Sequence, residues 1–250
     1  PAATPLELLR LYDSSDWKPA AMSVLRAQRG DEETTSLLLL LERVYGTAVA
    51  ARLSPSSRTA RVIEFIGALD EGESLNVACS VPDTVRHRAA ETISRPLPQS
   101  SIRKILLYHA MVAEHGSFPT RLPRSMGVLC GLPTSHIRGV DEDIDLRAWN
   151  KRLGSFILST IKSRTVSQAP DWDTVVRATH RVMTLGEFAV GSLPSTGGEI
   201  HATDLEKRQR YLTQLILDYW DIRRDSDGVD LSVLSSADLE AAVDKRSAAR

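Results

Sequence analysis

Arginine side chains are the residues of this sequence whose type and spacing point most clearly to chemistry. Arg58 and Arg61 lie three positions apart, so a helix would present both on one face. The guanidinium group is planar, stays charged and forms paired hydrogen bonds with phosphate oxygens. With aromatic rings that stack on bases, such cations are typical of a groove that holds a single-stranded nucleic acid. The candidate nucleic-acid contacts are Tyr12, Trp17, Arg43, Arg52, Arg58, Arg61, Arg103, Lys104, Arg124, Lys162 and Arg164.

A single arginine is more often one half of a solvated surface ion pair, so the hypothesis depends on the set. The sequence holds 25 arginines and 6 lysines, and GC-rich coding alone would also favour arginine. The distribution of charge adds to the case. Residues 84–166 carry 13 basic and 6 acidic side chains, whereas residues 1–83 carry 8 and 12 and residues 167–250 carry 10 and 14. A basic middle third therefore lies between two acidic ends, although the net charge is only −1.

Motifs for catalysis or metal binding are weak. Ser101 and Lys104 have a Ser-x-x-Lys spacing, but no partner motif follows and the pair fits a capped helix start. The acids at 141–145 fit the first turn of a helix better than a cation site. The six histidines lack metal-binding spacing, and the glycines near Gly197 lack the lysine of a phosphate loop. We expect no catalytic residue, no metal, no cofactor and no enzymatic activity.

Composition sets further bounds. The 250 residues are 42% hydrophobic and 25% charged, as in ordinary globular proteins. No apolar run approaches the roughly 20 residues that span a bilayer, so we expect no membrane association. Cys79 and Cys130 are single, which fits a reducing compartment and builds no metal site.

Helices are the elements predicted to position the arginines. The run Leu37–Leu41 must be buried, acids precede it at the helix start, and Gly46 is expected to end that helix. No alternation of apolar residues is long enough for a strand. A segment rich in proline and glycine at 116–140 predicts a break between two helical lobes, so the fold class is all-α. Helices are predicted within 5–11, 14–30, 31–46, 54–69, 81–94, 96–116, 141–164, 171–189, 202–224 and 235–246.

Five blocks, in order, resemble one family, the nucleoprotein of phlebovirus-like and tenuivirus-like (phenuivirus) negative-strand RNA viruses. They are YDSSDWKPAAMSVLRAQRG (12–30), DEETTSLLLLLERVYG (31–46), SPSSRTARVIEFI (54–66), SSIRKILLYHAMVAEHGSFPTRLPRSMGVLCGLP (100–133) and TDLEKRQRYLTQL (203–215). The blocks match an aromatic-led helix ending in glycine, an acid-led apolar helix, a Ser-led basic helix, an Arg-bearing helix with a Pro/Gly connection, and a late Glu-Lys-Arg helix.

The resemblance implies a viral nucleocapsid protein that encapsidates single-stranded genomic RNA without sequence preference. The implied fold has two helical lobes flanking a basic RNA-binding slot. A short N-terminal arm, residues 1–14, would precede an N-lobe at 15–115 and a C-lobe with its tail helix at 116–250. By position, Tyr12 matches an aromatic of the slot, and Arg43, Arg58, Arg103 and Arg164 match its basic residues. The implied partners are RNA, other copies of the chain through the arm or the tail, and the viral polymerase, in the virion and the host cytoplasm.

An alternative is a helical adaptor that binds protein partners and no nucleic acid. Its anchors would be Tyr219 and Trp220, because large aromatic side chains often dominate protein interfaces.

Overall fold

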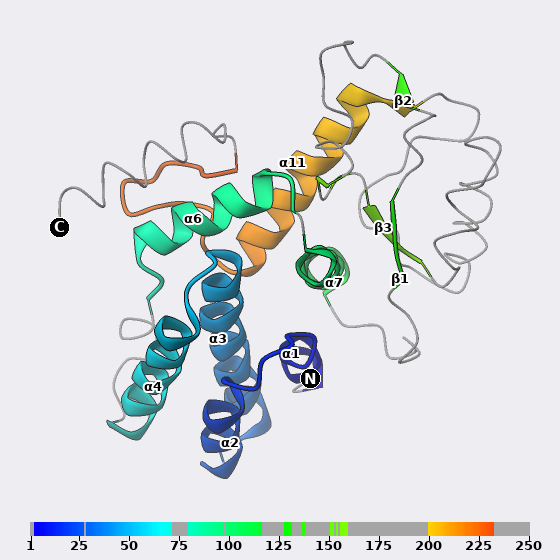
Figure 1. Ribbon diagram of the computed structural model, residues 1–250. Helices are drawn as coiled ribbons and strands as arrows, with labels where there is room; N and C mark the ends of the chain where they lie inside the picture. Colours follow the sequence, from blue (N-terminus) through cyan, green and yellow to red (C-terminus); the bar gives the residue numbers. More distant parts are fainter. Residues whose placement is uncertain are drawn as a thin grey trace. The chain divides into compact units, whose positions relative to one another are not determined.

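The computed structural model describes residues 3–27, 29–71, 80–97, 99–116, 128–131, 137–138, 151–152, 154, 156–159 and 200–232. Most of these residues are helical, which confirms the predicted predominance of helices. Two compact units are formed, one by Pro1–Thr92 with Leu217–Arg250 (unit 1) and one by Ile93–Ile216 (unit 2). The helices are α1 (Ala3–Leu9), α2 (Lys18–Arg26), α3 (Asp31–Ala50), α4 (Pro55–Glu71), α6 (Asp83–Ser94), α7 (Ser100–His115) and α11 (Ala202–Tyr219) (Figure 1).

Helix α3 is the centre of unit 1, because α1, α2 and α4 all contact it (Figure 1). Asp31, Glu32 and Glu33 occupy its first turn, where acidic side chains interact favourably with the helix dipole. Of the leucine run, Leu38 and Leu41 are fully buried, but Leu39 is 38% exposed. The expectation that the whole run is buried was therefore wrong for Leu39, since a helix of 3.6 residues per turn directs consecutive side chains to different sides.

Gly46 lies inside α3 and does not end it, which corrects the predicted helix boundary. A Cβ atom at this position would lie 2.5 Å from Tyr12 Oη, 2.8 Å from Glu42 Oε1 and 2.9 Å from Trp220 Cζ2. The glycine is needed for close packing of side chains against the helix. Glycine lowers the stability of a helix by about 1 kcal/mol relative to alanine. Here α3 nevertheless continues through it to Ala50.

Unit 1 is completed by residues that come much later in the chain. Trp220, Ile222 and Leu231 are at most 1% exposed and belong to its core together with Leu38 and Phe65. The chain leaves unit 1 within α6 and returns to it within α11. Unit 1 is therefore built from two segments that are far apart in the sequence.

Unit 2 contains four short strands among its described residues. β1 (Val128–Gly131) pairs antiparallel with β3 (Phe156–Ser159), and β2 (Ile137–Arg138) pairs parallel with β4 (Ile200–His201). Helix α7 contacts β1 and β3. The sequence predicted helix through residues 156–159 and no strands, so this part of the prediction was wrong. The stretch Phe156–Ser159 is too short for a periodic signal but gains a ladder with Val128–Gly131.

A buried polar hub fixes α11 to the chain before β3. Arg208 donates a hydrogen bond to the Gly154 carbonyl oxygen, and Gly154 N–H donates to Gln209 Oε1 at 2.7 Å. Gln209 Nε2 also donates to the Ile93 carbonyl oxygen at 2.8 Å. Burial lowers the pKa of Arg208 to about 10, while the carboxylate of Glu114 opposes that shift. A Cβ at Gly154 would lie 2.7 Å from the Leu205 carbonyl oxygen, so glycine permits the close approach.

Unit 1 is discontinuous, because the last segment of the chain joins the first. The sequence predicted an arm at 1–14, an N-lobe at 15–115 and a C-lobe at 116–250. That functional division at residues 14 and 115 stays a prediction. Helix α1 lies within the predicted arm, and its Leu8 and Leu9 are fully buried in unit 1. The predicted helices at 171–189 and 235–246, and most of the break at 116–140, lie outside the described residues.

Candidate nucleic-acid interface

The structure brings three of the predicted cations together at the corner between α3 and α4. Arg52 lies in the four-residue connection, and Arg58 and Arg61 lie in the first two turns of α4. Arg58 Nη1 donates to the Leu53 carbonyl oxygen at 3.1 Å, so its guanidinium folds back over the connection that carries Arg52. Ser54 Oγ accepts a hydrogen bond from Ser57 N–H at 3.2 Å and thereby caps α4. We call Arg52, Arg58 and Arg61 the corner cluster.

Arg52 closes α3 in an unusual conformation. Its φ is 54°, in the left-handed region that glycine normally occupies at this position. Arg52 N–H donates to the Val49 carbonyl oxygen and Leu53 N–H donates to the Ala48 carbonyl oxygen, both at 3.0 Å, which forms a Schellman motif. A side chain here costs about 1–2 kcal/mol relative to glycine. The Arg52 side chain is exposed and has no partner among the described residues.

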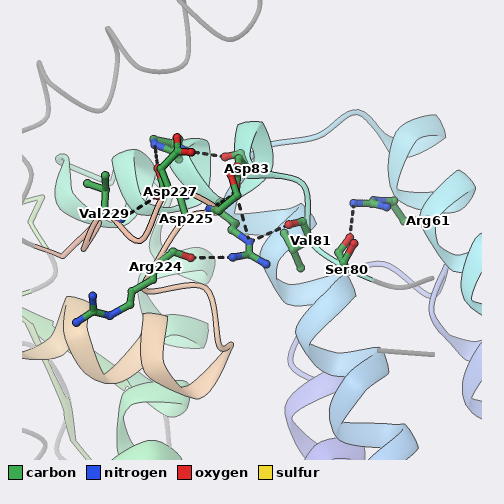
Figure 2. Close-up of polar contacts among 11 residues, drawn as sticks. Arg61, Ser80, Val81, Asp83, Arg224, Asp225, Asp227 and Val229 are labelled. Atoms are coloured by element: carbon green, nitrogen blue, oxygen red, sulfur yellow. Dashed lines mark hydrogen bonds and ion pairs between the residues drawn. The ribbon is translucent and has the colours of Figure 1, made fainter. Parts of the chain in front are cut away.

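The other two members of the corner cluster are held by neighbours. Arg58 Nη2 lies 3.9 Å from Asp16 Oδ2, at the limit of an ion pair. Arg61 Nη1 pairs with Glu64 Oε2 at 3.0 Å. Its Nη2 donates to the Ser80 carbonyl oxygen at 3.4 Å (Figure 2). These contacts hold the guanidinium groups in place while leaving part of each accessible. The positive end of the α4 dipole and the negative end of the α3 dipole both lie at this corner and offset each other, so the positive potential there comes from the guanidinium groups.

The remaining predicted cations fall elsewhere. Arg43 is not part of the corner cluster, because its Nη1 pairs with Asp221 Oδ2 at 3.2 Å. In unit 2, Arg103 Nη1 donates to the Leu97 carbonyl oxygen at 2.8 Å, and burial lowers its pKa. Lys104 follows it on α7 and is half-buried. Arg124, Lys162 and Arg164 lie outside the described residues.

Sequence reasoning missed two further cations on α11. Lys207 and Arg210 are exposed, lie three positions apart and have no partner among the described residues. Tyr211 is 39% exposed beside them, and its hydroxyl donates to Glu114 Oε1 at 2.9 Å. The spacing of Leu205, Leu212 and Ile216 could have identified them. These residues form the buried side of α11, which leaves Lys207 and Arg210 on the solvent side.

Tyr12 and Trp17 are packed in the core of unit 1, which differs from their predicted role as stacking platforms. Each is 6% exposed. Tyr12 meets Tyr45 edge to face, with ring centroids 5.2 Å apart and an interplanar angle of 83°. Trp17 Nε1 donates to the Ser14 carbonyl oxygen at 3.0 Å. In this structure neither ring leaves a face free for a base.

Glu42 explains the position of Tyr12. This carboxylate is fully buried and accepts hydrogen bonds from Tyr12 Oη at 3.1 Å and from Trp220 Nε1 at 3.3 Å. Burial, followed by the charge of Glu42, raises the pKa of Tyr12 well above its ordinary value. The same two causes raise the pKa of Tyr219, which Arg43 opposes. We call Glu42, Tyr12 and Trp220 the Glu42 hub.

Trp220 was the anchor of the alternative adaptor hypothesis, but its side chain is only 1% exposed. Because it is bonded to Glu42 inside unit 1, it cannot anchor a partner in this conformation. Tyr219, the other predicted anchor, is half-buried, and the adaptor alternative stays a prediction.

A second polar cluster fastens the segment after α11 onto α6 (Figure 2). His87 Nε2 lies 3.4 Å from Asp225 Oδ2, and both side chains are 2% exposed. His87 Nδ1 lies 2.8 Å from the Asp83 carbonyl oxygen. Arg86 Nη1 donates to the Arg224 carbonyl oxygen at 2.7 Å. We call Asp83, Arg86, His87, Arg224 and Asp225 the clasp, because their contacts join two segments of unit 1.

No group of three or more potential metal ligands occurs among the described residues. Within the same part of the chain, no helix is both long and apolar enough to cross a membrane. Comparisons with protein-family models, curated proteins and solved structures found no match.

Proposed function

We propose that this protein binds and coats single-stranded RNA without enzymatic activity, as a viral nucleoprotein does. The observation that carries the proposal is Arg52. An arginine occupies a left-handed position that would cost less with glycine, and its side chain is exposed without a partner in the described structure. Backbone strain of this kind is a reason to look for function. Arg58 and Arg61 beside it provide two more guanidinium groups for phosphate.

Binding would be dominated by phosphate contacts. Cations on helix starts recognise the repeating backbone and not the bases, so little sequence preference is expected. Lys207, Arg210 and Tyr211 would add a second basic surface with an exposed ring, in place of the stacking predicted for Tyr12 and Trp17. The ordered blocks that resemble phenuivirus nucleoproteins give independent support. On this proposal the protein also assembles with copies of itself, meets the viral polymerase, and resides in the virion and the host cytoplasm.

The first test is the absorbance ratio at 260 and 280 nm of the purified protein, with sizing of the same sample before and after ribonuclease. A high ratio that falls with ribonuclease is expected. The anisotropy of a labelled single-stranded RNA, measured over a range of salt, then gives the affinity and its salt dependence.

Arg52 variants separate binding from folding. Arg52→Ala should weaken RNA binding roughly tenfold by removing a charged contact. It should also reduce the slope of log affinity against log salt by about 0.7. Arg52→Gly should lose the same binding but raise the free energy of unfolding by about 1 kcal/mol, since glycine relieves the left-handed strain. The matched control is Arg88→Ala, another exposed unit 1 arginine with no partner in the described residues. Equal binding by the Arg52 and Arg88 variants, or a wild-type protein that binds no RNA, would contradict the proposal.

A further inference from the structure

Helix α2 has one face packed in unit 1 and one apolar face left uncovered. Ala20, Ala21 and Val24 are buried on the side where α2 contacts α3 and α4. Met22 and Leu25, three positions apart on the opposite side, are each 49% exposed. Exposed apolar side chains that occur singly are ordinary, but a pair on one helix face forms a small continuous surface.

Two cations flank this apolar pair. Lys18 lies one turn before Met22 and Arg26 lies one turn after it, so both share its face. Both are exposed and have no partner among the described residues. We call Lys18, Met22, Leu25 and Arg26 the α2 face. Pairing of this face with the same face of another copy would bring cations together, so its charge favours an acidic and apolar partner.

The C-terminal part of the chain has that chemistry. In the predicted helix at 235–246, Leu239 and Val243 lie four apart, and so do Glu240 and Asp244 directly after them. Residues 235–244 carry three acidic side chains and no basic one, and Lys245 and Arg246 follow at the end of the predicted helix. A helix with this pattern presents an apolar stripe edged by carboxylates, the complement of the α2 face.

We propose that the α2 face of one copy binds residues 235–244 of a second copy. This deepens the self-assembly in the proposed function and rests on it, but it requires no RNA. The segment after α11, which leads to the docking segment, is joined to α6 through Arg224 and Ser226, whereas α2 lies toward the opposite end of α3 (Figure 1). That separation favours a partner copy over the chain's own tail. The contact is heterologous, because different surfaces meet, so repetition builds a ring or a filament.

The test uses the full-length protein, treated with ribonuclease and held in low salt, with its mass measured by light scattering at several concentrations. The wild type is expected to assemble as its concentration rises. Met22→Asp with Leu25→Asp should weaken assembly at least tenfold, because it places carboxylates against the carboxylates of residues 235–244. Ile63→Asp is the matched control: Ile63 is 63% exposed in the same unit but lies outside the α2 face, so assembly should persist.

Exchange of charges between the α2 face and the C-terminal segment tests whether that segment is the one that binds. Lys18→Glu with Arg26→Glu should weaken assembly, as should Glu240→Lys with Asp244→Lys, and all four substitutions together should restore it. A wild type that stays monomeric, or assembly unaffected by the α2 substitutions, would overturn the proposal. RNA anisotropy on the same variants separates the two proposals, because assembly without RNA binding would refute only the proposed function.

Discussion

The two units of the molecule each bury a charge, but they satisfy it in opposite ways. Unit 1 buries the anion Glu42, which accepts hydrogen bonds from the side chains of Tyr12 and Trp220. Unit 2 buries the cation Arg208, which donates to the backbone carbonyl oxygen of Gly154 and also feels the carboxylate of Glu114. A side-chain hub depends on the identity of each partner, whereas a backbone carbonyl is present whatever residue supplies it.

The partners also differ in their distance along the chain. Tyr12 is 30 positions and Trp220 is 178 positions from Glu42, whereas Gly154 is 54 positions from Arg208. The Glu42 hub therefore joins three separate segments of unit 1 at one carboxylate. We expect the stability of unit 1 to depend more on the identity of its hub side chains. We expect the stability of unit 2 to depend more on substitutions that push two backbone segments apart.

Removal of the Glu42 carboxylate should have the largest effect. Glu42→Ala leaves the buried donors of Tyr12 and Trp220 without their acceptor and opens a cavity, which should cost about 3–5 kcal/mol of unfolding free energy. Urea denaturation followed by tryptophan fluorescence measures it. Glu42→Gln keeps the shape and one acceptor oxygen and should cost less than half as much. Equal losses in the two variants would show that the hydrogen bonds of the hub matter little.

The two packed glycines test the backbone side of the comparison. Gly154→Ala would place a Cβ 2.7 Å from the Leu205 carbonyl oxygen, a backbone atom of α11 that cannot move alone. Gly46→Ala meets side-chain atoms at 2.5–2.9 Å, so Tyr12, Glu42 and Trp220 must shift but the backbone need not. We expect losses of about 3 kcal/mol at Gly154 and about 2 kcal/mol at Gly46, measured by the same denaturation. A larger loss at Gly46 would reverse the comparison.

The loss of stability at alkaline pH should differ between the two units by a smaller amount. Burial raises the pKa of Tyr12 in unit 1 well above 10 and that of Tyr108 in unit 2 to about 12. Their contribution to stability is complete below pH 10, where the unfolded phenols are also protonated, and it is lost as the pH rises from 10 toward the folded values. Tyr12→Phe should lessen the alkaline loss for unit 1 more than Tyr108→Phe does for unit 2, as followed by tyrosinate absorbance during stopped-flow unfolding. Ionisation of Tyr12 near pH 10 in the folded protein would contradict its burial beside Glu42.

Local pattern was sufficient for much of the helical framework. The acids at Asp31–Glu33 mark the start of α3, and the serines before Arg58 mark the start of α4. Both are short-range effects of capping and the helix dipole, so nearby residues determine them. The proximity of Arg58 and Arg61 followed from helical spacing for the same reason.

The residues that sequence reasoning misplaced are those whose environment comes from distant segments. Gly46 is a residue type that often ends a helix, but here it packs against Trp220, which is far away in the chain. Tyr12 has an aromatic ring that could stack on a base, but its hydroxyl donates to the buried Glu42 and the ring lies in the core. Phe156–Ser159 forms a strand because Val128–Gly131 is available to pair with it. Tertiary contacts of this kind override local propensity and leave no local mark.

The discontinuity of unit 1 has a consequence for its synthesis on the ribosome. Residues 1–92 emerge first, yet the core that they share with Trp220, Ile222 and Leu231 is incomplete until those residues follow. At 5–20 residues per second, the interval from residue 92 to residue 232 is roughly 7–30 s. Unit 2 is fully translated within that interval, so the nascent chain can fold its second unit before its first. During the same interval the side of α3 that later receives Trp220 is open to chaperones.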